Sequence, residues 1–338
     1  MKKMNNQTII IAEAGVNHNG DIKLAKKLID VAAKSGADFV KFQTFKANNL
    51  LIKNTKKTNY QIKTTGHKEN QYELIKRLEL TKEMHHELIS HCSKKKINFF
   101  STAFDKESLK MLIDLGQEII KIPSGEITNL PLLKFIGSQK KKVILSTGMS
   151  DINEISQALK ILKEFGTSKK NIYILHCNTE YPTPKKDVNL NAMLTIRDKF
   201  NLVVGYSDHT SGIEVPIAAV ALGAKIIEKH FTLSRDLDGP DHSSSLEPDE
   251  LSRMIESIRN IEVALGNGVK KPSPSEIKNK KLIRRSIVAS QDINKGELFS
   301  EKNLDVKRPA NGISPMEWDK LIGTFSPKKF KKDQKIKI

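Results

Sequence analysis

The chain has few cysteines and no long apolar segment. Cys92 and Cys177 are the only cysteines in 338 residues, which argues against a disulfide framework and favours a reducing, cytoplasmic location. No apolar run approaches the ~18 residues that a transmembrane helix needs. The segment Met1–Ile11 carries two lysines, but the apolar stretch before Glu13 spans four residues, too short for the ~7–15-residue core of a signal peptide. We therefore expect a cytoplasmic protein with no membrane partner.

Aromatic residues and arginine are also scarce. Aromatic residues make up 6% of the chain, and eight of the 57 basic residues are arginines, in a chain of formal net charge +18. A large positive charge is typical of proteins that bind nucleic acid or membrane surfaces, but such sites gather their basic side chains on one face. Here the lysines are spread over most of the expected helices and loops. The charge therefore favours a solvated, lysine-rich surface, and we expect no nucleic-acid partner.

Eight short apolar segments recur along the chain, and a helix-length amphipathic segment follows most of them. The first such helix, Ile22–Ser35, repeats its apolar residues at helical spacing between a candidate N-cap, Asp21, and Gly36. Eight strand–helix pairs in about 270 residues is the count of a closed (β/α)8 TIM barrel, which is the predicted fold. The expected strands are Thr8–Gly15, Phe39–Phe45, Asn98–Phe104, Ile119–Ser124, Val143–Gly148, Ile172–Cys177, Leu202–Asp208 and Lys225–His230.

A change in composition marks the end of the expected barrel. Gly266–Ser275 is rich in glycine, proline and lysine, which is typical of a linker. We expect a barrel over residues 1–268, a linker over 269–281 and a small appended domain over 282–338. The long polar segment Lys46–Leu80 follows the second strand, where a long loop often forms a lid or a wall of the substrate site.

Active sites of TIM barrels lie where the strands end, and the expected strand ends carry carboxylates, lysines, histidines and hydroxyls. Lysines among hydroxyls favour a cradle for a phosphate or a carboxylate. Alternatively, each lysine only pairs with a glutamate, or one of them forms a Schiff base. Each carboxylate is a candidate for a general base, a metal ligand or an acceptor of hydrogen bonds from substrate hydroxyl groups. This inventory indicates an enzyme with an anionic substrate. Its members are Glu13, Lys41, Gln43, Thr102, Lys121, Ser124, Glu126, Ser146, Tyr181, Ser207, Asp208, His209, His230 and Asp241.

His209 and His230 end two consecutive expected strands, the seventh and the eighth. Neighbouring strands lie ~4.8 Å apart, so the two imidazoles can share a divalent ion such as Mn, Zn, Fe or Co. The alternative is that each histidine is structural and hydrogen-bonded. Cys177 adjoins His176, but neighbours along a strand point to opposite faces, which favours a buried structural thiol over a nucleophile.

Short motifs occur in order at nearly every expected strand end. They are Ala12–Gly20, Lys41–Gln43, Ser101–Thr102 with Phe104, Lys121–Glu126, Ser146–Met149, His176–Pro184, Gly205–Thr210, Glu228–Phe231 and Gly239–His242. Together they resemble the sialic acid synthases, the family that makes nonulosonic acids. In the tail, Arg284–Ser286 and Lys307–Gly312 resemble the small antifreeze-like (SAF, β-clip) domain of the same family. The resemblance spans the whole chain.

The resemblance implies a reaction. Phosphoenolpyruvate condenses with an N-acyl hexosamine and water: C3 attacks the aldehyde of the open-chain sugar, water adds at C2, and the C–O bond to phosphate breaks. It implies that His209 and His230 hold a divalent ion that polarises the aldehyde. Mn²⁺ is the expected ion, with Mg²⁺ and Co²⁺ as alternatives. A non-catalytic carbohydrate-binding protein would not need both an anion cradle and a metal pair.

The resemblance also implies roles for individual residues. Catalytic roles fall to Glu126, expected as the acid or base near the water, and to Glu13, His230 and Lys121. A further anion contact falls to Thr179 or to its neighbour Asn178. The residues expected to hold the phosphate and carboxylate are Lys41, Thr102, Lys121, Ser124, Ser146 and Ser207. Those expected to bind the sugar hydroxyls and the acyl amide are Glu13, Gln43, Tyr181 and Asp241.

Arg308, in the tail, resembles an arginine that enters the barrel of the partner subunit and contacts the sugar in this family. The resemblance therefore implies a domain-swapped homodimer, whereas the residue alone is equally consistent with a surface salt bridge. N-acetylmannosamine is the expected acceptor sugar, which makes the expected product N-acetylneuraminate. The alternatives are an N,N'-diacetyllegionaminate synthase and, after it, a pseudaminic acid synthase.

Overall fold

The computed structural model describes residues 7–338. The chain forms two compact units, Met1–Gly266 and Asn267–Ile338. Residues 1–6, part of the segment weighed as a signal peptide, lie outside the described residues. Within residues 7–338, no helix is both long and apolar enough to span a membrane.

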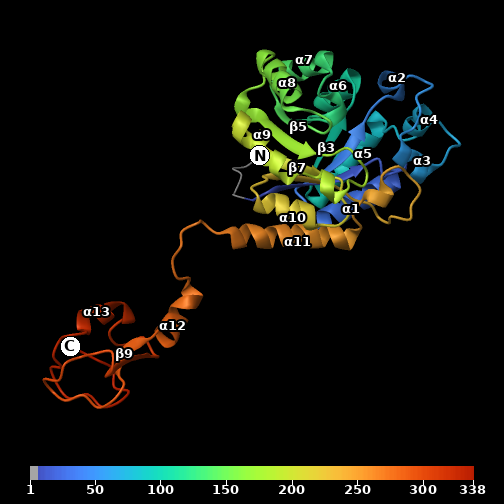
Figure 1. The fold of residues 1–338 in the computed structure, drawn as a ribbon. Helices are drawn as coiled ribbons and strands as arrows, with labels where there is room; N and C mark the ends of the chain where they lie inside the picture. The colour runs from blue at the N-terminus through green and yellow to red at the C-terminus, as the bar shows by residue number, and fades with distance from the viewer. Residues whose placement is uncertain (1–6) are drawn as a thin grey trace. The chain divides into compact units, whose positions relative to one another are not determined.

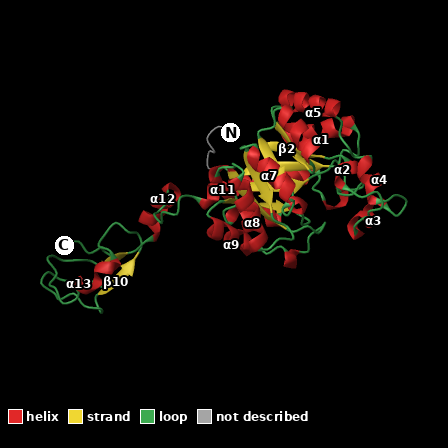
Figure 2. Cartoon of the chain, turned by 90° about the horizontal axis from the view of Figure 1, so that it is seen from above, coloured by secondary structure: helices red, strands yellow, loops and turns green. Residues whose placement is uncertain are grey.

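The first unit is a (β/α)8 barrel, as predicted. Its eight strands are all parallel and follow the hydrogen-bonded order β3-β2-β1-β8-β7-β6-β5-β4, and helices surround them (Figure 1, Figure 2). Near the start of β4, the Gln117 amide accepts from the Ser101 N–H at 2.8 Å and donates to its carbonyl at 3.0 Å, joining this edge to β3. The strands are β1 (Ile9–Gly15), β2 (Phe39–Thr44), β3 (Asn98–Ala103), β4 (Ile119–Ile122), β5 (Lys142–Ser146), β6 (Ile172–Cys177), β7 (Val203–Asp208) and β8 (Ile226–His230).

The first outer helix begins and ends at the residues that its capping signals predict. Asp21 accepts a hydrogen bond from the Lys23 N–H and begins the first helix, and Gly36 follows its end at φ +83°. That helix turns Leu28 and Ile29 to the strands. The long helices are α1 (Ile22–Lys34), α5 (Lys82–Lys95), α6 (Lys106–Asp114), α7 (Leu130–Ser138), α8 (Ile152–Glu164), α9 (Leu190–Phe200), α10 (Glu214–Ala221) and α11 (Pro248–Leu265).

Alternation along each strand separates two apolar regions. In β8, Ile227 faces outward into the cluster between strands and helices, whereas Ile226 belongs to a separate cluster with Ile11, Phe100, Ile144 and Leu175. This second cluster fills the barrel interior. Two residues after Ile226 along the same face comes Glu228, so the interior changes from apolar to charged toward the C-terminal strand ends.

The segment expected as a lid or wall after β2 contains three short helices, α2 (Ala47–Leu50), α3 (Asn59–Thr65) and α4 (Gln71–Lys76). The last begins at a reciprocal cap between Asn70 and Glu73. Its buried Leu74 packs with Phe45. On α3, the Thr64 hydroxyl is 3.4 Å from the carbonyl of Pro240 on the loop after β8. The segment thus adjoins that loop, while its role in binding stays a prediction.

The second unit has its own small core, built around Ile287, Phe299 and Phe330. Its strands β9 (Ser286–Ala289) and β10 (Leu304–Lys307) are antiparallel, and a short helix, α13 (Trp318–Leu321), follows. The region predicted as a linker is partly helical. There α12 (Pro274–Ile283) begins at Ser273, where Glu276 completes a capping box and proline occupies the first helical turn.

Candidate active site

A buried cluster of two lysines and two glutamates lies inside the barrel at the C-terminal strand ends. Lys41 Nζ, from β2, is 2.7 Å from Glu13 Oε2 of β1 and 3.6 Å from Glu228 Oε2 of β8. Lys121 Nζ, from β4, is 3.4 Å from Glu228 Oε1. All four side chains are at most 6% exposed. Glu228 therefore joins the two lysines, one on β2 and the other on β4, which lies across the barrel from β8.

Hydroxyl groups complete the contacts of this cluster. Lys41 Nζ donates to Thr102 Oγ1 at 2.8 Å, and Lys121 Nζ donates to Ser146 Oγ at 2.7 Å. Ser207 Oγ donates to Glu228 Oε1 at 2.9 Å. Of the predicted lysine–hydroxyl cradle, all members except Ser124 thus belong to one connected network.

The electrostatics of the cluster set the charges of its members. Burial alone would raise the pKa of Glu228, but Lys121 and Lys41 outweigh burial and lower it to about 2. Burial raises the pKa of Glu13 to about 7, even though Lys41 opposes the change. Burial also lowers the pKa of Lys121. For Lys41, the two glutamates outweigh burial and raise the pKa. Glu228 is therefore the carboxylate that stays ionised, and Glu13 is the one able to hold a proton near neutral pH.

A second group of polar side chains surrounds Gly148, just after β5. Ser124 Oγ accepts a hydrogen bond from the Gly148 N–H at 2.9 Å and lies 3.2 Å from Cys177 Sγ. A methyl group on Gly148 would come within 2.6 Å of the Thr179 methyl carbon and 2.8 Å of Ser124 Oγ. Of the two candidates for an anion contact, Thr179 therefore lies beside Ser124. Asn178 instead uses its carboxamide oxygen to accept from the Glu180 N–H at 2.8 Å.

The two predicted metal-ligating histidines meet at the same end of the barrel. Their ring centroids are 5.5 Å apart, and the Tyr181 ring contacts both, at 4.1 Å from His209 and 5.6 Å from His230. His209 donates from Nδ1 to the Asn178 carbonyl, because a carbonyl only accepts; Nε2 then accepts from the Tyr181 hydroxyl at 3.0 Å. Burial lowers the pKa of His209 to about 4 and that of His230 well below its usual value. Both imidazoles are neutral, the form that binds metals.

This pair fits a divalent ion. His230 Nδ1 is buried and has no hydrogen-bond partner among the residues described, and Asp241 Oδ2 lies 3.9 Å from it. Over residues 7–338, no group of three or more His, Cys, Asp or Glu side chains is arranged to hold a metal. His209 and His230 would therefore be the protein ligands, with the ion in place of the Tyr181 hydroxyl at His209 Nε2 and with substrate or water supplying the other ligands.

The remaining predicted sugar-binding residues surround the histidines. Gln43 Nε2 donates to Glu13 Oε1 at 3.2 Å. Burial raises the pKa of Asp241 to about 6. Because Gly15 has no side chain, His230 and Gln43 can lie close to its backbone: a Cβ there would lie 3.3 Å from His230 Cε1 and 3.4 Å from Gln43 Nε2. Its φ of +53° also favours glycine.

Two predicted site residues remain, Glu126 in the first unit and Arg308 in the second. Glu126, in a short 3-10 turn after β4, accepts a hydrogen bond from Asn129 Nδ2 at 2.6 Å. Arg308 is exposed on the second unit, before a cis peptide bond to Pro309. Sequence reasoning also missed one central residue, Glu228. It stands two positions before His230, and this spacing places both side chains on one face of a strand.

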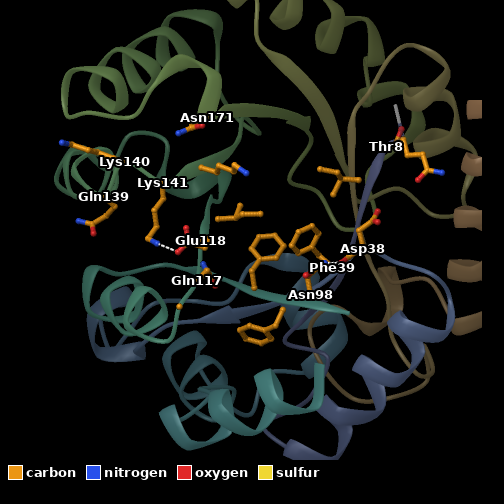
Figure 3. Close-up of a pocket in the computed structure, with 17 residues that line it drawn as sticks. Thr8, Asp38, Phe39, Asn98, Gln117, Glu118, Gln139, Lys140, Lys141 and Asn171 are labelled. Carbon is orange, nitrogen blue, oxygen red and sulfur yellow. Dashed lines mark hydrogen bonds and ion pairs between the residues drawn. The ribbon is translucent and has the colours of Figure 1, made fainter. Parts of the chain in front are cut away.

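A cavity of about 1060 Å³ lies at the opposite, N-terminal end of the barrel. Figure 3 shows Phe39 within it, while Gln139 and Lys140 point outward and Lys141 meets Glu118 in an ion pair of 2.8 Å. No polar side chains labelled there converge on a common point. In TIM barrels this end serves stability rather than chemistry, so the candidate site is the charged cluster.

Comparison with known proteins agrees with this geometry. The NeuB family matches residues 28–270 and the SAF domain residues 284–337. The chain is 56% identical to the N,N'-diacetyllegionaminic acid synthase of Campylobacter jejuni, over 98% of this chain and 99% of the relative. It is 48% identical to the enzyme of that name from Legionella pneumophila, over 93% and 89%. The solved N-acetylneuraminic acid (sialic acid) synthetase of Leptospira borgpetersenii is 38% identical, with a TM-score of 0.71 over 81% of this chain and 90% of that one. The chain belongs to the NeuB family and carries a C-terminal SAF domain.

Proposed function

We propose that this protein is an N,N'-diacetyllegionaminate synthase, a transferase that condenses phosphoenolpyruvate with 2,4-diacetamido-2,4,6-trideoxymannose and water and releases phosphate. The observation that carries the reaction class is the buried pair Lys41 and Lys121, linked by Glu228 at 3.6 and 3.4 Å. The choice of sugar is supported by the relatives at 56% and 48% identity, which are legionaminic acid synthases. They favour this alternative over N-acetylmannosamine, the sugar first expected from the sequence.

The lysine end of the site would bind phosphoenolpyruvate. Two buried ammonium groups with hydroxyl neighbours suit a phosphate and a carboxylate, and Ser146 and Thr102 already orient the lysines at 2.7 and 2.8 Å. Glu228 keeps the two cations paired when no anion is present. The Ser124 hydroxyl, which accepts a hydrogen bond from the Gly148 N–H, would offer a further polar contact beside Thr179.

The histidine end would bind the sugar, since Gln43, Tyr181 and Asp241 surround it with amide, hydroxyl and carboxyl groups. A divalent ion held by His209 and His230 would supply Lewis-acid polarisation of the sugar aldehyde. Glu13, between the two ends, is placed to take or give a proton as the new C–C bond forms between C3 of phosphoenolpyruvate and the aldehyde carbon. Water then adds at C2, and phosphate leaves. We keep Glu126 as a candidate for the acid or base near that water.

Arg308 would complete the sugar site from a second copy of the chain, in a domain-swapped homodimer. Its exposure on the second unit is consistent with that role. A guanidinium group is suited to hydrogen bonding with several sugar oxygens at once.

The test is phosphate release from phosphoenolpyruvate with Mn²⁺ and each sugar in turn, with product masses confirmed. We expect a larger kcat/KM with 2,4-diacetamido-2,4,6-trideoxymannose, because the two sugars differ at C4 and C6 and a polar pocket rejects a poorly matched group. A larger value with N-acetylmannosamine would restore the N-acetylneuraminate interpretation. Release with neither sugar would overturn the proposed reaction.

A further inference from the structure

Directly behind the two histidines, outside the barrel interior, lies a fully buried ion pair. Lys229 precedes His230 on β8 and points to the opposite face, toward the helices. Its Nζ is 2.5 Å from Asp208 Oδ2, and both side chains are 0% exposed. Asp208 ends β7, immediately before His209, and is the register partner of Lys229 between the two strands.

The same pair closes the turn that carries His209. Asp208 Oδ1 accepts from the Thr210 N–H at 3.0 Å, and Oδ2 accepts from the Thr210 hydroxyl at 3.0 Å. Lys229 Nζ also donates to the Thr210 carbonyl. Asp208 and Thr210, which flank His209, are therefore both bonded to Lys229, the residue before His230.

Stability alone is a poor explanation for this arrangement. Two charges without solvent contact carry a desolvation cost that their attraction often fails to recover, and an apolar pair of similar size is frequently as stable. What the pair does provide is a fixed relation between two backbones, each bearing one imidazole. The rings whose spacing it governs are 5.5 Å apart.

We propose that Lys229 and Asp208 are positioning residues that hold His209 and His230 at the spacing needed to bind one divalent ion and, through it, the sugar aldehyde. The inference rests on the proposed function for the sugar, but its direct readout is cation binding. The phosphoenolpyruvate end lies apart from the pair, because Lys41 and Lys121 are held by Glu228 and the hydroxyls inside the barrel.

The decisive variant is the double substitution Lys229→Met with Asp208→Asn. It removes both charges together, so no unpaired buried charge remains, and the asparagine oxygen can still accept from the Thr210 N–H. The control is Lys141→Met with Glu118→Gln, which neutralises an ion pair of 2.8 Å at the other end of the barrel. For each full-length protein we would measure the Tm without metal, the Kd for Mn²⁺ by calorimetry, and both KM values.

We expect the double variant to melt within a few degrees of the wild type, yet to bind Mn²⁺ at least roughly tenfold more weakly and to show a raised KM for the sugar alone. The control should match the wild type in every measurement. A double variant that is folded and binds Mn²⁺ as the wild type does would overturn the positioning role, as would a wild type without Mn²⁺ affinity. The proposed function stands or falls separately, on phosphate release by the wild type. The single variant Lys229→Met should melt at a lower temperature than the double variant, because it leaves the buried Asp208 carboxylate without a cation. A higher Tm for the single variant would contradict the ion pair between Lys229 and Asp208.

Discussion

Glu228 Oε1 lies 3.4 Å from Lys121 Nζ, with both side chains almost completely buried. Glu228 thereby compensates a cation that burial would otherwise destabilise, and through its other oxygen it does the same for Lys41. In the proposed reaction, the phosphate and carboxylate of the substrate would also compensate the positive charges of the two lysines. The site is thus neutralised from within when empty and can accept an anion without reorganising its lysines.

The first prediction concerns Glu228→Gln. Removing one partner of a buried pair costs about 3–5 kcal/mol, so the variant should melt below the wild type. Inorganic phosphate should then raise its Tm by roughly 2–4 °C more than it raises that of the wild type, since the anion replaces the missing charge. Thermal melts with and without phosphate measure this, with Glu118→Gln at the other end of the barrel as the control. An equal phosphate effect in all three proteins would contradict the account.

The second prediction uses two glycines that lie close in sequence to residues proposed to contact the phosphate. In Gly148→Ala, the new methyl group meets Thr179 and Ser124 at 2.6 and 2.8 Å, whereas in Gly125→Ala it meets nothing within 4 Å. Overpacking of this kind costs roughly 1–3 kcal/mol. We expect the KM for phosphoenolpyruvate to rise about tenfold or more in the first variant and to stay within about twofold in the second. Steady-state phosphate release decides; similar values for both would place the anion elsewhere.

The third prediction separates metal ligands from structural histidines. His209→Ala and His230→Ala should each abolish measurable Mn²⁺ binding in calorimetry while leaving the circular dichroism spectrum unchanged, because two imidazoles are the expected protein ligands. His67→Ala, on the exposed segment after α3, serves as the matched control and should bind Mn²⁺ normally. Retained Mn²⁺ binding by both site variants would rule out His209 and His230 as the ligands of the ion.

The fourth prediction tests the exchanged domain. Arg308→Ala and Lys121→Met should each be nearly inactive as purified proteins. After subunit exchange at equal concentrations, half of the dimers are hybrids, and one of their two sites combines an intact Lys121 with the partner's intact Arg308. Activity should then recover to about a quarter of the wild-type value. If both residues act within one chain, mixing restores nothing.

Much of the barrel could be predicted from the sequence because its periodicities are local. The expected strand Ile172–Cys177 matches the structure residue for residue, and the expected helix Ile22–Ser35 is longer than the observed one, Ile22–Lys34, by its last residue. The secondary structure of the linker was harder to predict. Its proline and lysine content suggested a segment without regular secondary structure, yet Ser273 and Glu276 form a capping box that starts a helix.

The charged cluster was only half predictable. Lysines and hydroxyls at strand ends pointed to an anion cradle, but the central place of Glu228 depends on how far β8 reaches across the barrel to Lys121. That distance is a property of the closed sheet rather than of any local pattern. The same holds for Lys229 and Asp208, whose pairing requires the register between β7 and β8.

A competition experiment tests most directly which sugar the protein uses. The wild-type protein is given phosphoenolpyruvate, Mn²⁺ and equal concentrations of N-acetylmannosamine and 2,4-diacetamido-2,4,6-trideoxymannose, and the two products are quantified by mass spectrometry while less than about a tenth of either sugar has reacted. Their ratio equals the ratio of the two kcat/KM values. We predict that N,N'-diacetyllegionaminate is in large excess; an excess of N-acetylneuraminate would contradict the proposed function.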